Sequence, residues 1–266
     1  MGGGRVVQVG VSGAMLNMIE HGVATDRTPL LIAHGLYGSA RNWGVIARRL
    51  SDERRVVAVD MRNHGDSAWD GAHGYGDLAD DLAEVIAHIG GPVDVLGHSM
   101  GGKAAMMLAL RHGDLVRRLV VADIAPVAYG HSQMSFITAM RSVDLGRVER
   151  RSDAEGQLAA LGVDPALQSF FTQSLDVAGK RWRLNLDALA HQMPQIMGFP
   201  QVDGAWRGPA LFLTGGNSDY VRPEHRPIIR ALFPKARFAR LSGAGHWLHA
   251  EKPREFEATI RAFVNA

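Results

Sequence analysis

Gly97-His-Ser-Met-Gly101 directly follows the apolar run Val93-Asp-Val-Leu96 and precedes a stretch rich in alanine, methionine and leucine. The run before it is typical of a buried strand, and the stretch after it is typical of a buried helix. A serine flanked in this way by two glycines predicts a sharp strand-to-helix turn that presents the Ser99 hydroxyl at the start of the helix. The glycines remove side chains that would otherwise crowd the turn. We therefore expect Ser99 to be a nucleophile.

Two backbone amides are expected to form an oxyanion hole beside Ser99. The amide of Met100, the next residue, lies at the helix N-terminus, where the helix dipole favours negative charge. The second amide should come from the loop His34-Gly-Leu-Tyr-Gly38, which follows another apolar run. Leu36 is the candidate donor in that loop. Because such a pair of donors stabilises a tetrahedral oxyanion, this arrangement favours acyl-transfer chemistry.

A serine nucleophile needs a general base, and the chain has 12 histidines from which position must select one. His246 lies in Ser242-Gly-Ala-Gly-His-Trp247, a glycine-rich loop between the last strand pattern and the last helical pattern. Such a loop can return the imidazole to the sheet edge where Ser99 is expected. The order of serine before histidine also fits this architecture. His246 is therefore the predicted base, and His249 is the alternative.

Two aspartates compete for the acid that orients the imidazole. Asp123 is the first residue after the strand pattern 119–122, and strand ends at this edge face the site. Asp219 follows the next strand, which is the commoner position for the acid. In that loop, however, the acid usually stands three residues after the first glycine, where this chain has Ser218. The sequence therefore favours Asp123 and leaves Asp219 as the alternative.

Strand and helix patterns alternate along the chain, which predicts an α/β fold. A hairpin is expected from residues 6–11 and 14–19 with Gly13 between them, and strands are expected at 30–33, 56–59, 93–96, 119–122, 210–213 and 236–240. Helical patterns lie at 42–50, 75–89, 101–110 and 253–264. Continuously apolar strands between helices are typical of a mostly parallel sheet that is covered on both faces.

One long stretch breaks this alternation. Between residues 127 and 208 only helical patterns are found, at 132–143, 152–161, 165–175 and 185–193. An all-helical insertion between two strands suggests a cap over a site. We therefore expect a core made of residues 1–126 and 209–266, with a helical cap at 127–208.

The composition narrows the class of protein. The chain has 266 residues, of which 46% are hydrophobic and 21% are charged, as in a globular protein. It has no cysteine, which excludes disulfides, cysteine-zinc sites, iron–sulfur clusters and a thiol nucleophile. A net charge of +2 gives no nucleic-acid footprint. No apolar run is long enough to span a membrane, and the N-terminal residues lack the apolar core of a signal peptide, so we expect a cytoplasmic protein.

Six stretches together carry a family resemblance: His34-Gly-Leu-Tyr-Gly-Ser39, Asp60-Met-Arg-Asn-His-Gly-Asp-Ser67, Gly97-His-Ser-Met-Gly-Gly-Lys103, Asp123-Ile-Ala-Pro126, Gly215-Gly-Asn-Ser218 and Gly243-Ala-Gly-His-Trp-Leu-His-Ala-Glu-Lys-Pro253. Over essentially its whole length the chain resembles the α/β-hydrolase-fold serine hydrolases. Among these it is similar to the small esterases related to the YbfF esterase and the abhydrolase-domain-11 proteins. The resemblance implies that the acid stands at Asp123.

These inferences combine into an expected function, a serine carboxylesterase that hydrolyses small to medium carboxylic esters, with thioesters as a further substrate class. The mechanism would pass through an acyl-enzyme and needs no metal or organic cofactor. We expect a small-molecule ester as partner, no nucleic acid, and a monomer or homodimer. A carbon–carbon bond hydrolase, a cofactor-free perhydrolase and a non-catalytic ligand receptor are the alternatives. Residues expected to contact the substrate are His34, Gly35, Tyr37, His98, Trp182 and Trp247.

Overall fold

Eight strands pair into one sheet within residues 4–11 and 14–266, the part of the chain that the computed structural model describes. The strand order is β1-β2-β4-β3-β5-β6-β9-β10. The strands are β1 Arg5–Val11, β2 Ala14–His21, β3 Leu30–Ala33, β4 Val56–Val59, β5 Val93–His98, β6 Val116–Ala122, β9 Ala210–Gly215 and β10 Ala236–Leu241. All pairings from β4 to β10 are parallel, whereas β1–β2 and β2–β4 are antiparallel. The predicted α/β fold with a mostly parallel sheet is confirmed.

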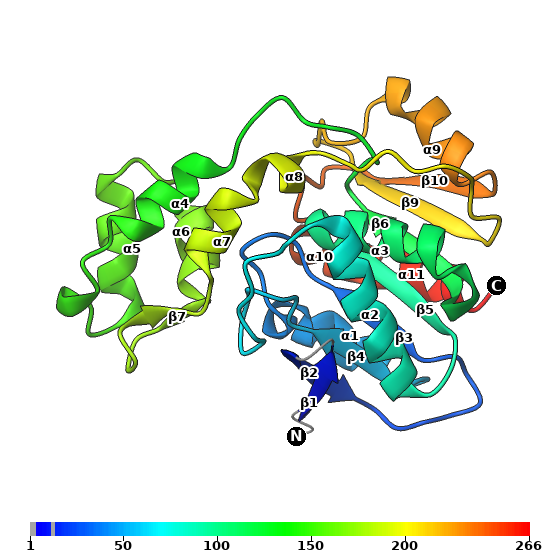
Figure 1. Ribbon diagram of the computed structural model, residues 1–266, viewed down its shortest axis with the longest axis horizontal. Coiled ribbons are helices and arrows are strands. Elements are labelled where there is room, and N and C mark those ends of the chain that lie inside the picture. Colours follow the sequence, from blue (N-terminus) through cyan, green and yellow to red (C-terminus); the bar gives the residue numbers. More distant parts are fainter. Residues whose placement is uncertain (1–3, 12–13) are drawn as a thin grey trace.

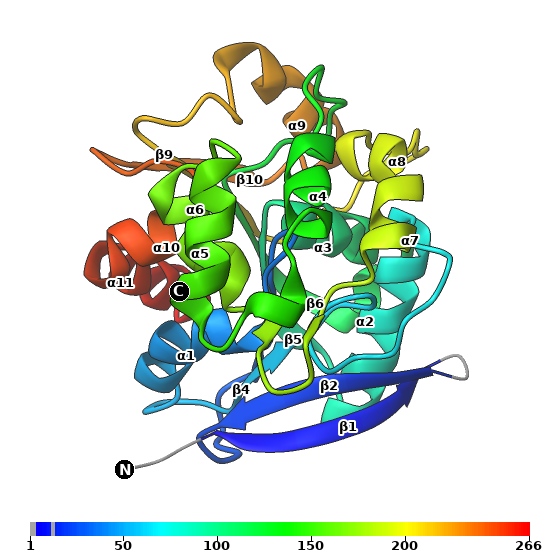
Figure 2. The ribbon, with the colours of Figure 1, turned by 90° about the vertical axis from the view of Figure 1, so that its left-hand side faces the viewer.

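Helices cover both faces of this sheet, which explains why β3, β4 and β5 are buried at every residue. Figure 2 shows α1 and α11 on one side of the sheet and α2 and α3 on the other. The helices that flank the sheet are α1 Gly44–Leu50, α2 Tyr75–Ile89, α3 Met100–Arg111, α9 Arg226–Leu232, α10 Leu248–Glu251 and α11 Pro253–Val264. The helices expected at 75–89 and 253–264 have the predicted bounds.

The N-terminal hairpin also forms as expected. Strands β1 and β2 pair antiparallel, with Arg5 opposite Glu20 and Val9 opposite Leu16. Strand β2 then pairs with β4 and so joins the hairpin to the parallel part of the sheet. Gly13, the predicted turn residue, lies outside the described residues.

The stretch between β6 and β9 is helical, as expected, but it also contains a short hairpin. Its helices are α4 Met134–Arg141, α5 Arg151–Ala160, α6 Pro165–Thr172, α7 Leu186–His191 and α8 Met193–Met197. Strands β7 Leu175–Asp176 and β8 Arg181–Trp182 form the hairpin, which is too short to give a period in the sequence. The expectation of helices alone was therefore wrong. Figure 1 shows α4 to α7 as a lobe beside the sheet, with α8 leading back to it.

The single helix expected at 185–193 is in fact two. Helix α7 begins after Asn185, whose side chain accepts a hydrogen bond from the amide of Ala188. It ends at His191, and α8 begins at Met193 with Pro194 in its first turn. Proline lacks the amide hydrogen that a continuous helix would need at that point, so the chain starts a new helix there.

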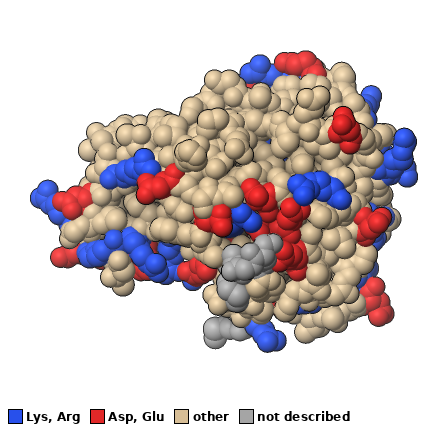
Figure 3. Space-filling model, in the orientation of Figure 1, with Lys and Arg blue, Asp and Glu red and all other residues tan. Residues whose placement is uncertain are grey.

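The surface carries both charge signs. Figure 3 shows acidic and basic side chains interspersed on one face, with broad uncharged areas between them. That pattern gives no single basic patch on the face in view. Within residues 4–11 and 14–266, none of the helices combines the length and apolar character needed to cross a bilayer.

Candidate active site

The predicted turn at Ser99 joins β5 to α3 and holds the serine in a strained conformation. Its φ of 52° lies in the left-handed region that non-glycine residues rarely adopt. A Cβ on Gly97 would lie 2.2 Å from the carbonyl oxygen of Gly101, and a Cβ on Gly101 would lie 2.3 Å from the carbonyl oxygen of Ala33. Both positions therefore require glycine, although Gly101 makes room for the end of β3 rather than for Gly97.

Ser99, His246 and Asp123 form one hydrogen-bonded chain. The Nε2 atom of His246 lies 3.1 Å from the Oγ atom of Ser99, and its Nδ1 atom lies 2.7 Å from a carboxylate oxygen of Asp123. Because Nδ1 faces a carboxylate, it is the nitrogen that carries the proton, which leaves Nε2 free to accept the Ser99 proton. This arrangement can perform general-base activation of a serine.

Asp123 is fully buried and held on both carboxylate oxygens. One oxygen accepts a hydrogen bond from the amide of Gly215 at 3.0 Å, and the other accepts one from the hydroxyl of Ser218 at 2.5 Å. Ser218 thus occupies the position where the acid usually stands in that loop, and it donates to Asp123, which directly follows β6. Sequence reasoning did not foresee this contact, because the two residues meet only through the pairing of β6 with β9.

Neither alternative residue enters this hydrogen-bonded chain. Asp219 is exposed, and among the described residues its backbone carbonyl accepts a hydrogen bond from Arg222. The ring of His249 is buried and stacks on Trp43 with ring centroids 4.2 Å apart. Burial, together with the neighbouring His246, lowers the pKa of His249 to about 3. The structure therefore brings Asp123 and His246 to Ser99 and leaves both alternatives aside.

An aromatic side chain also packs against the imidazole ring of His246. The ring of Tyr220 stacks on the imidazole with centroids 4.0 Å apart and planes inclined by 21°. The hydroxyl of Tyr129 donates a hydrogen bond to the carbonyl of Tyr220 at 2.7 Å. Sequence reasoning did not select Tyr220, because the loop around it carries no periodic pattern. This stacking fixes the plane of the imidazole and so keeps the Nε2 atom directed toward Ser99.

Leu36 and Met100, whose amides are predicted to form an oxyanion hole, line the same cavity as Ser99. Neither the Leu36 nor the Met100 amide donates a hydrogen bond to another of the residues that the structure describes. Both therefore remain available to a ligand. The next amide in the loop, that of Tyr37, donates to the Nε2 atom of His64 at 3.2 Å, and this bond fixes the loop that carries Leu36. The Leu36 and Met100 amides remain the predicted donors of an oxyanion hole.

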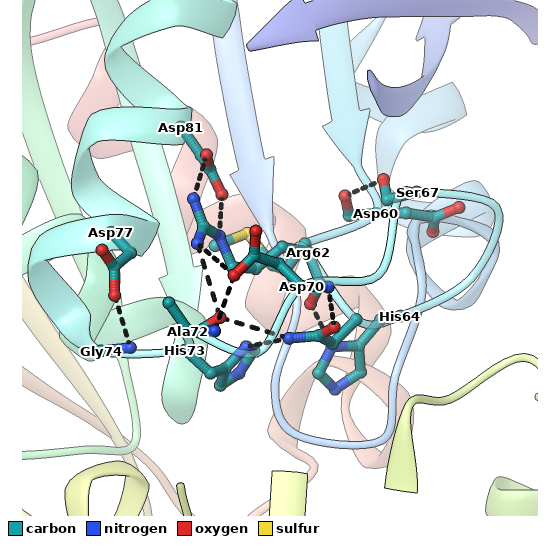
Figure 4. Close-up of polar contacts among 12 residues, drawn as sticks. Asp60, Arg62, His64, Ser67, Asp70, Ala72, His73, Gly74, Asp77 and Asp81 are labelled. Carbon is teal, nitrogen blue, oxygen red and sulfur yellow. Dashed lines mark hydrogen bonds and ion pairs between the residues drawn. The ribbon is translucent and has the colours of Figure 1, made fainter. Parts of the chain in front are cut away.

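A polar network links the chain segments that follow β3 and β4, and Figure 4 shows the part of it that follows β4. Arg62 forms two hydrogen bonds with the carboxylate of Asp81, at 2.6 and 2.7 Å. Ser67 donates to the carbonyl of Asp60 at 2.5 Å, and Asp60 accepts from the amide of Ala40 at 2.7 Å. These residues therefore fix the conformation of the segments that follow β3 and β4.

His34 and His64 belong to the same network and are held neutral. Burial is the main cause that lowers the pKa of His34 to about 4 and that of His64 to about 3. The Nε2 atom of His34 accepts the amide of Met61 at 3.0 Å, and its Nδ1 atom donates to the carbonyl of Gly35 at 2.8 Å. A protonated ring would have no acceptor nitrogen, so the hydrogen bond from the Met61 amide requires the neutral form of His34.

We expect the stabilising effect of His64 to decline below about pH 6.5, because the unfolded chain then binds a proton that the folded protein excludes. At about pH 5 this costs the folded state about 2 kcal/mol of unfolding free energy. A His64→Gln variant keeps an acceptor and does not titrate. Denaturant unfolding of both proteins at about pH 7.5 and about pH 5 isolates the effect, since every other titrating group is shared. An unchanged difference between the two proteins would contradict the neutral assignment.

A cavity of about 280 Å³ lies over this site. Five of the residues expected to contact substrate line it, namely His34, Gly35, Tyr37, His98 and Trp247. Trp182 does not: its indole nitrogen donates to the carbonyl of Met140 at 2.9 Å inside the helical insertion. Its expected substrate contact is therefore withdrawn. Apolar side chains from α4 and α6 complete the wall, among them Phe136, Phe170 and Phe171.

Comparison with known proteins identifies the family of the chain. The profile of the alpha/beta hydrolase family matches residues 30–259. The chain belongs to the alpha/beta hydrolase family. The matched segment contains Ser99, Asp123 and His246 together with the loops that hold them.

Individual relatives of this alpha/beta hydrolase are named as esterases and lipases. It is 41% identical to the sn-1-specific diacylglycerol lipase ABHD11 of Mus musculus, over 88% of this chain and 80% of that protein. It is 38% identical to the esterase YbfF of Escherichia coli, over 90% of this chain and 94% of that protein. Among solved structures, a marine microorganism esterase superposes with a TM-score of 0.87 at 36% identity, covering 93% of this chain and 98% of that one.

Proposed function

We propose that this alpha/beta hydrolase is a serine carboxylesterase that acts on small to medium carboxylic esters, with thioesters as a further class. The hydrogen-bonded chain from Ser99 through His246 to Asp123 is the observation that carries the proposal. It supplies a nucleophile, a base and an orienting acid in the order that acyl transfer requires. The esterase and lipase names of its relatives support the same reaction class.

The reaction would proceed in two steps. As the Ser99 oxygen attacks the ester carbonyl, Nε2 of His246 takes the hydroxyl proton, and the Leu36 and Met100 amides hold the oxyanion. When the carbon–oxygen bond breaks, His246 returns that proton to the departing alcohol and leaves an acyl-serine. His246 then deprotonates a water molecule, which attacks the acyl carbonyl and releases the acid together with the free Ser99 hydroxyl.

In this proposal residues 127–208 act as a cap over the cavity. Helices α4 and α6 contribute Phe136, Phe170 and Phe171 to its wall, opposite the loops of the sheet. Phe170 and Trp247 lie with ring centroids 6.1 Å apart, so an aromatic ring of the insertion meets the loop that carries His246. An apolar wall of this kind suits the hydrocarbon chain of an acyl group.

Truncating Phe170 should shift the acyl-chain preference toward longer chains. The Phe170→Ala change opens space in the cavity wall, so kcat/KM for a longer p-nitrophenyl ester should rise relative to the acetate by about tenfold. A series from acetate to decanoate on both proteins measures the shift. Phe238→Ala is the matched control, because Phe238 lies on β10 away from the cavity lining. The same preference in all three proteins would refute the assignment of this wall to the acyl chain.

A further inference from the structure

The side chain of Lys103 is a buried cation in the wall of the same cavity. It lies on α3, four residues after Ser99, and is only 1% exposed. Its Nζ atom donates to the carbonyl oxygens of Met197 and Gly198, at 3.1 and 2.5 Å. Both carbonyls belong to the end of α8, where the helical insertion returns to the sheet. Lys103 therefore joins the nucleophile helix to that end of the insertion.

No negative charge compensates this cation among the residues that the structure describes. The Nζ atom lies 4.8 Å from the ring centre of Tyr129 and 5.6 Å from that of Tyr75, and it forms no ion pair with a described acidic side chain. Burial raises the pKa of both tyrosine hydroxyls, so they are neutral. Burial also lowers the pKa of Lys103 to about 7, so near neutral pH the ammonium form is present beside the neutral amine, and an anion bound at this position would favour the ammonium. An ammonium group with two carbonyl acceptors has one further proton to donate.

The cavity therefore has two chemically different parts. The aromatic side chains of α4 and α6 and Trp247 form an apolar part, whereas the part around Lys103 carries an unpaired cation framed by aromatic rings. Lys103 follows Ser99 by four positions, which is a rise of about 6 Å along the helix axis. A short substrate chain can span that distance.

We propose that the part of the cavity around Lys103 is a subsite for a carboxylate carried by the substrate beside its scissile ester bond. The proposal rests on the esterase function proposed above and narrows its substrate class to esters that bear an acidic group. A bound carboxylate would accept a hydrogen bond from the third N–H of the ammonium. It would also supply the negative charge that no described acidic side chain provides there. Burying both charges together favours such a pair, because each would be costly alone.

Matched pairs of esters test the subsite. The p-nitrophenyl monoesters of adipic and suberic acid carry a free carboxylate, and the corresponding methyl-capped diesters are neutral and nearly the same size. Butyrate esters of p-hydroxybenzoic acid and of its methyl ester place the charge on the alcohol side. We expect Lys103→Met to lower the ratio of anionic to neutral kcat/KM by about ten- to hundredfold in at least one pair. Lys103→Arg should retain most of that preference.

Controls separate this subsite from a purely structural role. Lys235→Met removes one exposed positive charge far from the cavity lining, so its ratio should match that of the unmodified protein. If Lys103 serves only to anchor the end of α8, Lys103→Met should affect both members of every pair equally, and the proposal falls. In the unmodified protein, a preference of more than about tenfold for the neutral member of every pair would also overturn it, even where Lys103→Met does not fold.

This proposal and the esterase function can fail separately. Turnover of the neutral esters with no dependence on Lys103 would leave the esterase function intact and remove the subsite. Absence of turnover on all of these esters, together with an unreactive Ser99, would remove the esterase function itself.

Discussion

Replacing Ser99 with alanine should lower kcat/KM on p-nitrophenyl butyrate by about four to six powers of ten. The Ser99 hydroxyl lies 3.1 Å from its proton acceptor, the Nε2 atom of His246, and alanine leaves no nucleophile at this position. The change removes one oxygen atom at a position that is already strained. The fold should therefore survive, and thermal unfolding of the variant measures this.

His246→Ala should lower turnover to a similar level, because the two residues act as a unit and their losses do not add. A double variant tests this: its residual rate should equal that of either single variant within about an order of magnitude. Near-normal turnover in Ser99→Ala would show that another group attacks the ester, and the mechanism would then be wrong.

Asp123→Asn should reduce kcat/KM by about three to four powers of ten, whereas Asp219→Asn should change it by less than about twofold. The asparagine amide can turn an N–H toward Nδ1 of His246, which would drive the imidazole proton to Nε2 and block proton transfer from Ser99. Asp219 is exposed and does not touch the imidazole. The two substitutions are chemically identical and so form a matched pair.

The pH dependence of turnover gives a second test of the Asp123→Asn and Asp219→Asn variants. If Asp123 stabilises the charged imidazole, the Asp123→Asn variant should reach its residual rate only at a higher hydroxide concentration, because solvent must then act as the base. The Asp219→Asn profile should overlay that of the unmodified protein. A larger loss in Asp219→Asn than in Asp123→Asn would move the acid to Asp219.

Local sequence patterns were enough to place the main catalytic candidates. The apolar run before Gly97 and the helical pattern after Gly101 define the turn at Ser99 without any knowledge of distant residues. The loop of His246 is bounded by β10 and α10, which places it at the same edge of the sheet. Continuous apolar strands likewise predicted the parallel sheet, because burial on both faces removes polar positions.

Contacts between distant segments were beyond the reach of such patterns. The hydrogen bond from Ser218 to Asp123 depends on how β6 and β9 pair, and the stacking of Tyr220 on His246 depends on two loops that meet only in the fold. The position of Trp182 inside the insertion depends on the two-residue strand β8, which is too short for a period. The sequence gives no sign that Lys103 lies in the cavity wall; the structure places it there, without an acidic partner among the described residues.

Labelling with a fluorophosphonate probe tests the central claim most directly, since such a probe reacts with an activated serine. Intact mass and peptide mapping of the native protein should find one adduct, on the peptide that contains Ser99. The adduct should be absent in Ser99→Ala and formed far more slowly in Asp123→Asn than in Asp219→Asn. A native protein that stays unlabelled, as a non-catalytic receptor would, or an adduct at a residue other than Ser99, would contradict the account.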